Sequence, residues 1–549
     1  MKKNTIIVAV SITVLGIALR LHNLSQYMIY PDSYQVLLVA QNIQTYHSVV
    51  GQLGINGMAY PDFFAWTRSG YSLLTLFVSI FLPNLSIAAR YTSLIASIVS
   101  LSLAFVLGRM FFKSKTYGLA VLLLLSLSFN HAVWGGFILT EGVAVMFMLL
   151  FLLSMIAKPP LSTKYALSFA IGSGLLFGLL ILTRYEYSLL VVPVSLYFLR
   201  SKKYIWSDLF CFMAAFIFML ALVGSLLYPL PASLFLLLSQ SQDLLSKIGI
   251  LLATVVLLVV IVRRLPSKVK LQQQKYIKWV AIVLLWALPV LTLAIGRTLA
   301  PALRNFMLDD PLLVFFFLLG TTLLIHRKRY QEYVLFVFLS ILLLFTVYYR
   351  TNPGMERYLT HLIPFMLLPA GYGLVQTYTK ISNKTFVARL ALLILIFLIS
   401  LQIYITYQGI RNWGDKTWYQ ESYDEKVAVH TSQLIHSKNA LLLVSFPQPY
   451  FYYSRLSTYS VTDTYPYIYI PNTLNMKELV ISNDMGMHDQ FPHFSHFLQT
   501  HMSSFKIASF RVQKPYHFGA YSRKEIYPVV LYKTTVLELK KQIRKAQKT

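Results

Sequence analysis

Long apolar segments, separated by short polar connectors, make up most of this sequence. A helix that crosses the hydrocarbon core of a bilayer needs roughly 17 to 25 mostly apolar residues. Candidate segments lie near residues 5–19, 88–108, 118–134, 141–157, 165–182, 186–199, 206–228, 247–262, 278–296, 311–325, 331–348, 358–378 and 386–406. The pattern predicts an all-α polytopic membrane protein with about thirteen transmembrane helices.

Two further apolar stretches, near residues 33–43 and 70–83, are short or interrupted. We assign them to interfacial helices within one long first outer loop. With the N-terminus inside, every lysine-rich connector then faces the cytoplasm, as the positive-inside rule requires. Counting 70–83 as a span would move Arg109, Lys113 and Lys115 outside and invert the pattern downstream. The chain is therefore expected in the plasma membrane with a cytoplasmic N-terminus and an odd number of spans.

The character of the sequence changes near Asn412, where apolar runs shorten and polar and aromatic residues mix. Runs typical of strands, such as Ala440–Val444 and Tyr527–Tyr532, alternate with stretches typical of helices, such as Glu425–Ile435. We predict a transmembrane domain over residues 1–408 and a small extracytoplasmic α/β domain over residues 409–549.

Composition agrees with a protein that has lipid as its main solvent. Hydrophobic residues make up 56% of the chain and charged residues 12%, and the mean hydropathy is +0.60; soluble domains carry about 25% charged residues. The net charge of +28 would favour a nucleic-acid partner in a soluble protein. Here the basic residues fall mostly in connectors between apolar runs, so they indicate topology and not a nucleic-acid site.

The outer connectors are rich in arginine and nearly devoid of lysine. Under the predicted topology they hold one lysine, Lys247, and the arginines Arg20, Arg68, Arg90, Arg184, Arg297, Arg304, Arg350 and Arg357. Arginine presents an always-charged, bidentate fork to phosphate oxygens. Any one of these side chains could equally extend from a helix end toward water. As a group they predict binding of an anion at the outer surface.

Asp32 stands at the start of the stretch 33–43, directly after Pro31. Helix capping is the simplest role for an aspartate in this position. Asp32 is also one of few carboxylates in the outer loops of the transmembrane half. Activating a hydroxyl acceptor requires a base or hydrogen-bond acceptor close to it. Asp32 is the best-placed candidate for that role.

A series of short segments carries a resemblance to a known family. The first span and acidic outer loop are followed by Arg90-Tyr-Thr-Ser-Leu-Ile-Ala-Ser, Gly108-Arg-Met-Phe-Phe, Phe129-Asn-His-Ala-Val-Trp and Leu139-Thr-Glu-Gly. Later come Gly178-Leu-Leu-Ile-Leu-Thr-Arg-Tyr-Glu and Glu356-Arg-Tyr-Leu-Thr-His-Leu-Ile-Pro-Phe. These segments resemble the GT-C glycosyltransferases, and most closely the protein O-mannosyltransferase and aminoarabinose-transferase branch. The resemblance covers roughly residues 5–380 and is sparse between 210 and 351.

The resemblance implies transfer of a sugar from a polyprenyl-phosphate carrier to a hydroxyl acceptor on a protein, lipid or envelope glycan, with inversion. It implies that Asp32 is the general base and that Glu141 fills the acidic position of the second outer loop. Four further positions concern the donor phosphate. Arg68 occupies the place of a basic residue before the second interfacial helix, although the usual neighbouring prolines are missing. Arg184 and Arg357 match family segments, and Arg350 lies on the same connector as Arg357.

Further predictions concern contacts to the sugar or acceptor, metals and cofactors. His131 and Tyr34 are candidates for contact with the sugar or acceptor, and a structural interfacial histidine is the alternative for His131. The family often pairs two acidic residues where this chain has Asp32-Ser33, so the sequence supports no metal site, and a divalent metal stays an open alternative. No other cofactor is implied. A lipid-phosphate leaving group needs no nucleotide site, which fits the absence of a Gly-rich phosphate loop.

Two other functions fit parts of the pattern. A transporter or flippase for a lipid-linked or anionic substrate would also use many spans and buried arginines. Such folds often carry internal repeats or paired broken helices, and the sequence shows neither. An envelope-glycan polymerase or ligase would share the lipid-linked donor, but it usually concentrates arginines in one large late outer loop. The long first loop that carries Asp32 favours the glycosyltransferase.

Overall fold

The computed structural model divides the chain into two compact units. The described residues are 3–21, 31–47, 68–82, 84–157, 166–200, 206–227, single helical positions between 282 and 293, 301–327, 330–348, 356–381, 386–435, 441–444, 458–460, 478–483, 492–513 and 526–546. The first unit holds the helices up to Arg411, apart from α2 (Pro31–Tyr46). The second unit contains α2 and the chain from Asn412 onward. The predicted boundary after residue 408 stays a prediction.

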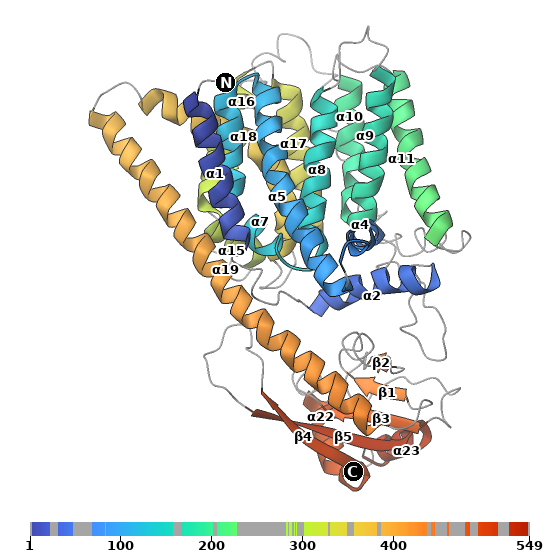
Figure 1. Ribbon diagram of the computed structural model, residues 1–549. Coiled ribbons are helices and arrows are strands. Elements are labelled where there is room, and N and C mark those ends of the chain that lie inside the picture. Colours follow the sequence, from blue (N-terminus) through green and yellow to red (C-terminus); the bar gives the residue numbers. More distant parts are fainter. Residues whose placement is uncertain are drawn as a thin grey trace. The chain divides into compact units, whose positions relative to one another are not determined.

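The first unit is a bundle of apolar helices (Figure 1). Its elements are α1 (Lys3–Leu21), α4 (Ser69–Ser79), α5 (Leu85–Phe112), α6 (Lys115–Leu127), α7 (Phe129–Trp134), α8 (Thr140–Ala157), α9 (Ala166–Thr183), η2 (Tyr185–Leu190), α10 (Val191–Arg200), α11 (Trp206–Leu227), α15 (Pro301–Asp309), α16 (Pro311–Ile325), α17 (Gln331–Tyr348), η4 (Glu356–Leu362), α18 (Ile363–Ile381) and the first part of α19 (Phe386–Leu434). Most of the predicted spans within the described residues are therefore helical.

Several of these helices are long and apolar enough to cross a membrane. Among the described residues four qualify on their own, and a fifth is the pair α15 and α16, which bend by 93° at their junction. Six shorter apolar helices accompany them. The chain is thus an integral membrane protein. The predicted span at 247–262 and most of that at 278–296 lie outside the described residues.

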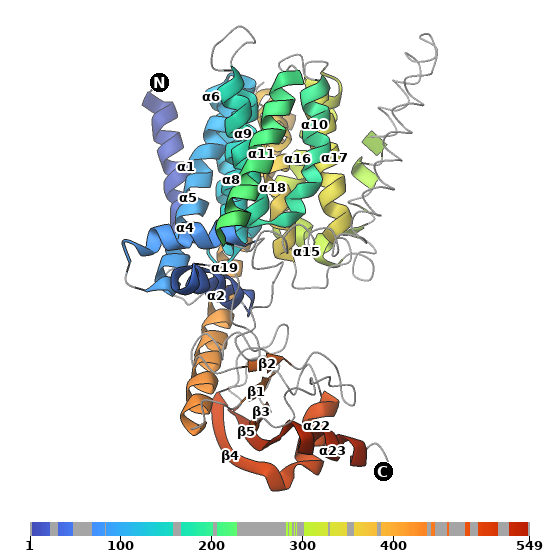
Figure 2. The same ribbon diagram turned by 90° about the vertical axis from the view of Figure 1, so that its right-hand side faces the viewer.

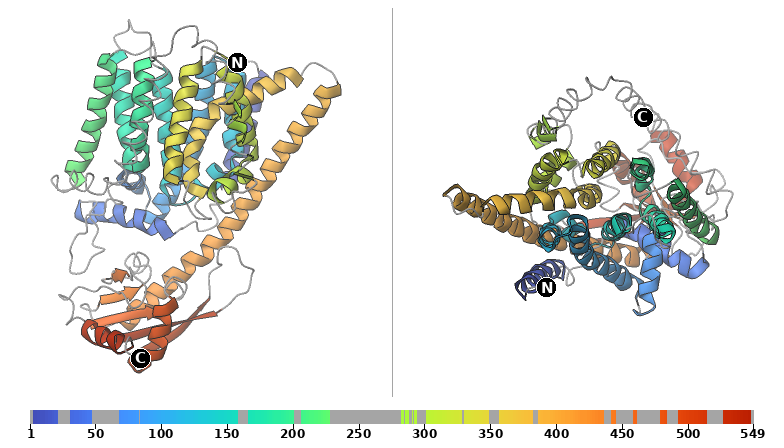
Figure 3. Two further views of the ribbon diagram at one scale, coloured as in Figure 1. Left: turned by 180° about the vertical axis from the view of Figure 1, so that it is seen from behind. Right: turned by 90° about the horizontal axis from the view of Figure 1, so that it is seen from above.

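Helix α18 occupies the interior of the bundle, whereas α11 and α19 lie at its periphery (Figure 3). In the apolar 18-residue stretch of the candidate span that includes α18, 94% of the residues are buried, compared with 28% in that of α11 and 22% in that of α19 between Leu392 and Asn412. Helix α18 packs against α16 through Gly320 and Gly373, where an added Cβ would collide with the backbone of the opposite helix. Small residues allow such close approach between membrane helices, whose association depends on packing.

Four predicted spans differ from the structure in their details. The predicted span 118–134 is two helices, α6 and α7, which are separated at Ser128. The predicted spans 186–199 and 358–378 begin with 3-10 turns, η2 and η4, before they become α-helical. Helix α19 does not end near residue 406 but continues to Leu434, so the predicted helix at 425–435 is its last part. These irregular segments lie at the ends of spans, and two of them form the candidate site.

The second unit contains a mixed five-stranded sheet with strand order β2-β1-β3-β5-β4. Strands β2 (Thr458–Ser460), β1 (Leu441–Val444) and β3 (Glu478–Asn483) are parallel, whereas β5 (Ile526–Thr535) and β4 (Lys506–Gln513) are antiparallel to their neighbours. Helices α22 (Pro492–His501) and α23 (Val536–Ala546) lie beside the sheet (Figure 2). Alternate apolar side chains of β3, Leu479 and Ile481, pack in one core with residues of both helices. The predicted strands at 440–444 and 527–532 are confirmed as β1 and β5.

Candidate active site

Several irregular segments of the first unit meet at the end of the bundle opposite the N-terminus (Figure 1). Helix α9 ends at Thr183, Arg184 adopts an extended conformation, and η2 follows at once. The turn η4 contacts α7, α8, α15, α17 and α18. The first turn of α8 carries Glu141. Short turns at helix ends expose side chains in directions that a regular helix does not allow, so these segments can converge on one point.

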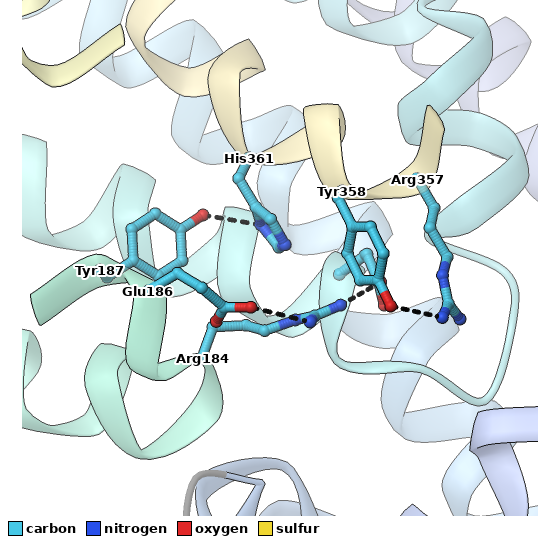
Figure 4. Close-up of polar contacts among 7 residues, drawn as sticks. Arg184, Glu186, Tyr187, Arg357, Tyr358 and His361 are labelled. Carbon is cyan, nitrogen blue, oxygen red and sulfur yellow. Dashed lines mark hydrogen bonds and ion pairs between the residues drawn. The ribbon is translucent and has the colours of Figure 1, made fainter. Parts of the chain in front are cut away.

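The centre of this convergence is Arg184, which is 7% exposed. Its guanidinium forms a close ion pair with Glu141 Oε1 and a second contact of 3.4 Å, from Nη1 to Glu186 Oε1 (Figure 4). Glu141 is fully buried and Glu186 is 6% exposed. Burial of charged groups is costly unless they are paired. The pairing of one guanidinium with two carboxylates therefore holds α8, α9 and η2 together.

Residues of η4 extend the cluster on the other side of Arg184 (Figure 4). The Arg184 guanidinium carbon lies 5.1 Å from the centre of the Tyr358 ring, and that of Arg357 lies 4.8 Å from it. Arg357 Nη2 also donates a hydrogen bond of 2.9 Å to the Tyr358 hydroxyl. Two arginines near one electron-rich ring gain favourable cation–π energy. Tyr358 thus helps two positive charges to coexist in a buried site.

A tyrosine–histidine pair completes this part of the site. The Tyr187 hydroxyl lies 2.9 Å from His361 Nδ1, and both side chains are almost fully buried. Tyr187 comes from η2 and His361 from η4, so this contact joins the same two turns as the Arg184–Tyr358 contact. The shape of the site is therefore set by polar contacts between segments that are far apart in the sequence.

Arg68 lies near the cluster, at the start of α4. Gly70, two residues later, packs closely against Thr183 and the backbone of α9 just before Arg184. The positive charges of Arg184 and Arg68 act on Tyr185, the first residue of η2. Burial, followed by the nearby Glu186 carboxylate, nevertheless raises the pKa of Tyr185 to about 12. Tyr185 is therefore a neutral hydrogen-bonding group at physiological pH.

A second polar network surrounds Arg20 at the end of α1. Arg20 is 1% exposed and donates to Ser97 Oγ at 2.8 Å, to backbone oxygens of residues 16, 125 and 126, and to His131 Nδ1 at 2.5 Å. Because Arg20 donates to Nδ1, the proton of a neutral His131 is on Nε2. His131 Nε2 is buried and has no hydrogen-bond partner among the described residues.

Asp310, at the bend between α15 and α16, explains why α6 and α7 separate at Ser128. Its carboxylate accepts hydrogen bonds from the backbone N–H groups of Phe129 and Asn130, at 2.7 and 3.1 Å, and from Ser128 Oγ at 3.0 Å. The Asn130 amide donates a further bond of 2.8 Å. A carboxylate in this position satisfies the free N–H groups at the start of α7. The Asp310 contacts fix the turn that carries His131.

The structure brings together four of the residues predicted from the sequence. Arg184, Glu141 and Arg357 share the buried cluster, and Arg68 lies near it. Asp32 is the second residue of α2, and Tyr34 is a buried residue of the same helix; both belong to the second unit. Arg350 lies outside the described residues. His131 is in the separate network of Arg20.

The prediction gave no role to four residues of the cluster: Glu186, Tyr187, Tyr358 and His361. It named Arg20 only among the outer arginines expected to bind an anion, and it gave no role to Asp310. Glu186 and His361 lie within the segments that carry the family resemblance, close to Arg184 and Arg357, so their proximity was a usable signal. Asp310 and Arg20 act through contacts with segments more than a hundred residues away, which the sequence alone does not show. Among the described residues no three His, Cys, Asp or Glu side chains are grouped to hold a metal ion.

Comparison with solved structures identifies proteins with a similar fold. No protein-family model and no curated protein sequence matches the chain. The archaeal oligosaccharyltransferase AglB from Archaeoglobus fulgidus, solved with an inhibitory peptide and a dolichol-phosphate, is 13% identical, with a TM-score of 0.57 over 90% of this chain and 71% of that one. ArnT from Cupriavidus metallidurans, bound to undecaprenyl phosphate, is 10% identical, with a TM-score of 0.55 over 96% of this chain and 98% of that one. The chain therefore has a GT-C-like fold.

Proposed function

We propose that this protein is a membrane glycosyltransferase, which moves a sugar from a polyprenyl-phosphate carrier to a hydroxyl acceptor on the outer face of the membrane. The observation that carries the proposal is the buried cluster of Arg184, Arg357, Glu141 and Glu186 at one end of an apolar helix bundle. The fold supports it, since the solved structures of AglB and ArnT contain polyprenyl phosphates of this class.

The arginines would act on the departing phosphate. Cleavage of the bond between sugar and phosphate increases negative charge on the phosphate oxygens, and fixed guanidinium groups in a poorly hydrated site stabilise that charge. Arg184 is shared with two carboxylates, so we assign the larger part of this role to Arg357, with Arg68 beside the cluster. Arg350 is the fourth proposed ligand, by its place on the connector before Arg357.

Asp32 is the proposed general base. It would take the proton from the acceptor hydroxyl while the hydroxyl oxygen attacks the anomeric carbon from the side opposite the phosphate. One such displacement inverts the configuration at that carbon. Glu141 is the second acidic candidate, and its ion pair with Arg184 leaves one carboxylate oxygen for the substrate. His131 and Tyr34 are proposed contacts to the sugar or acceptor.

The proposed orientation places the cluster outside. The N-terminus would be cytoplasmic, because every lysine-rich connector then falls on that side. Since the cluster lies at the end of the bundle opposite the N-terminus, this orientation puts it at the outer surface of the plasma membrane (Figure 1). The α/β domain is proposed to be extracytoplasmic. Reporter fusions after Lys115, Lys203 and Thr549 test this, and cytoplasmic activity of the last fusion would refute the orientation.

The direct test of the reaction uses purified protein and a panel of polyprenyl-phosphate sugars labelled in the sugar. We expect one donor to lose its sugar to an added acceptor or to water, with release of polyprenyl phosphate. Arg357→Lys keeps the charge but removes the bidentate fork, so it should slow this release. The exposed Glu332, in the first turn of α17, supplies a control variant, Glu332→Gln. Intact donors throughout the panel would contradict the proposal.

A further inference from the structure

Glu141 and Glu186 each have one carboxylate oxygen that no described residue of the protein contacts through a hydrogen bond. Oε1 of each residue contacts Arg184. Oε2 of each is buried and has no hydrogen-bond partner among the described residues. Glu141 is fully buried and Glu186 is 94% buried, so bulk water does not readily take the place of a donor. The cluster therefore holds two buried carboxylate oxygens without a donor among the described residues, each on a glutamate that pairs with Arg184.

Buried oxygens without a hydrogen-bond donor destabilise a folded protein. A buried acceptor without a donor loses about 1 to 3 kcal/mol relative to its hydrated state, and more when it carries charge. Pairing with Arg184 uses only one oxygen of each carboxylate. The other oxygen of each has no donor among the described residues, which indicates that a ligand supplies the missing donors.

The surroundings restrict the chemistry of that ligand. A divalent cation needs several oxygen ligands, whereas the described residues offer no group of three suitable side chains. The positive charges of Arg184 and Arg357 also oppose a cation at this position. Groups with O–H or N–H bonds fit instead, since they donate without carrying a full charge. A sugar ring presents several such groups on adjacent carbons.

We propose that Glu141 Oε2 and Glu186 Oε2 accept hydrogen bonds from hydroxyl groups of the donor sugar, and that they select a neutral sugar over a uronic acid. This inference rests on the proposed glycosyltransferase function. Two carboxylates repel the carboxylate of a uronic acid, whereas hydroxyl groups satisfy both acceptors. Arg184 positions the two glutamates, and the Arg357 guanidinium carbon lies 4.8 Å from the centre of the Tyr358 ring.

The test compares donors that differ by one group. Wild-type protein is assayed with the best hexosyl donor of the panel, with its mono-deoxy analogues, and with the corresponding uronic acid. A hydrogen bond to a charged group contributes enough to lower kcat/KM by about tenfold to hundredfold when the donor group is missing. We expect a loss of this size for at least one deoxy analogue, and a larger loss for the uronic acid.

Variants connect the loss to the glutamates. In Glu186→Gln the amide keeps the shape of the side chain but presents a donor or a weaker acceptor, so the penalty for the sensitive deoxy analogue should fall below about threefold. Glu141→Gln gives the same readout for the other oxygen and replaces Glu186→Gln if that variant does not fold. Glu332→Gln should keep the full penalty.

Four outcomes would overturn the inference. If wild type turns over the parent donor and all deoxy donors equally, the two oxygens do not bind hydroxyl groups of the sugar. An equal loss for all donors in Glu186→Gln assigns that residue a structural role. Stabilisation against heat by Mg²⁺ or Mn²⁺ alone, lost in Glu186→Gln, assigns the oxygens to a cation. Absence of turnover with every donor refutes the proposed function itself and this inference with it, so the two failures are distinguishable.

Discussion

Because Arg184 pairs with two glutamates, removing Arg184 should destabilise the protein more than removing one glutamate. Arg184→Met removes the positive charge and leaves two carboxylates buried together, at 0% and 6% exposure. Breaking a buried ion pair by removing one partner costs about 3 to 5 kcal/mol, because the other charge stays behind. Since two like charges remain here, we expect Arg184→Met to reach at least the upper end of that range.

Removing one glutamate should cost less. Glu141→Gln leaves Arg184 with Glu186, at 3.4 Å, and with an amide oxygen that still accepts a hydrogen bond. The expected loss is about 1.5 to 3 kcal/mol, the contribution of a hydrogen bond to a charged group. The triple variant, Arg184→Met with Glu141→Gln and Glu186→Gln, removes all three charges. It should be more stable than Arg184→Met alone, since the two buried carboxylates that would repel each other are gone.

Unfolding of the purified variants in detergent, followed by tryptophan fluorescence, measures these differences. Arg109→Met and Glu332→Gln change exposed residues of the same two types and should stay within about 0.5 kcal/mol of wild type. The reasoning would be refuted if Arg184→Met were no more destabilising than Glu141→Gln. A triple variant less stable than Arg184→Met would refute it as well, because the loss would then not arise from unpaired charge.

Three other changes follow from the structure. If Asp32 is the base, Asp32→Asn should lower turnover by about 10² to 10⁴. If Asp32 only caps the helix, the same substitution should leave turnover nearly unchanged, because Asn caps about as well as Asp. Transfer assays matched with unfolding curves separate the two roles. Asp310→Ala should lower the free energy of unfolding by at least about 3 kcal/mol, because it leaves the buried N–H groups at the start of α7 without an acceptor. An unchanged unfolding curve would contradict the capping contact. The pKa of Tyr185, raised to about 12 by burial and Glu186, exceeds the unfolded value of about 10. The unfolded state therefore loses its proton first, so this residue should leave stability unaffected below about pH 10 and reduce it between about pH 10 and 12; Tyr185→Phe should remove that part of the alkaline loss, and equal losses in both proteins would refute it.

Most helices of the bundle could be predicted from apolar length alone. The thickness of the bilayer sets a minimum length for a spanning helix, and segments such as α8, α9, α16 and α17 match the predicted ranges closely. The break at Ser128 could not be predicted in this way. It depends on the carboxylate of Asp310, 182 residues away in the sequence, which replaces the helix's own hydrogen bonds at that point.

In the candidate site, too, the sequence indicated residues but not the contacts between them. The positions of Glu141, Arg184 and Arg357 were indicated by the resemblance and by the excess of arginine over lysine in the outer connectors. The ion pairs among them were not, because Glu141 and Arg184 are 43 residues apart and meet only through the packing of their helices. The sequence suggested a clamp of arginines, whereas the structure pairs one of them with two carboxylates. The role of Asp32 stays a prediction.

The most direct test of the central claim is the fate of a lipid-linked sugar in vesicles that contain the purified protein. The donor carries one label in the sugar and another in the polyprenyl chain, and an acceptor with free hydroxyl groups is supplied on the side of the arginine cluster. A glycosyltransferase separates the two labels, so the sugar label moves to the acceptor while the lipid label remains as polyprenyl phosphate. If both labels stay on one molecule, whether or not it crosses the bilayer, the protein is not the enzyme proposed, and movement of the intact lipid across the bilayer would identify a flippase.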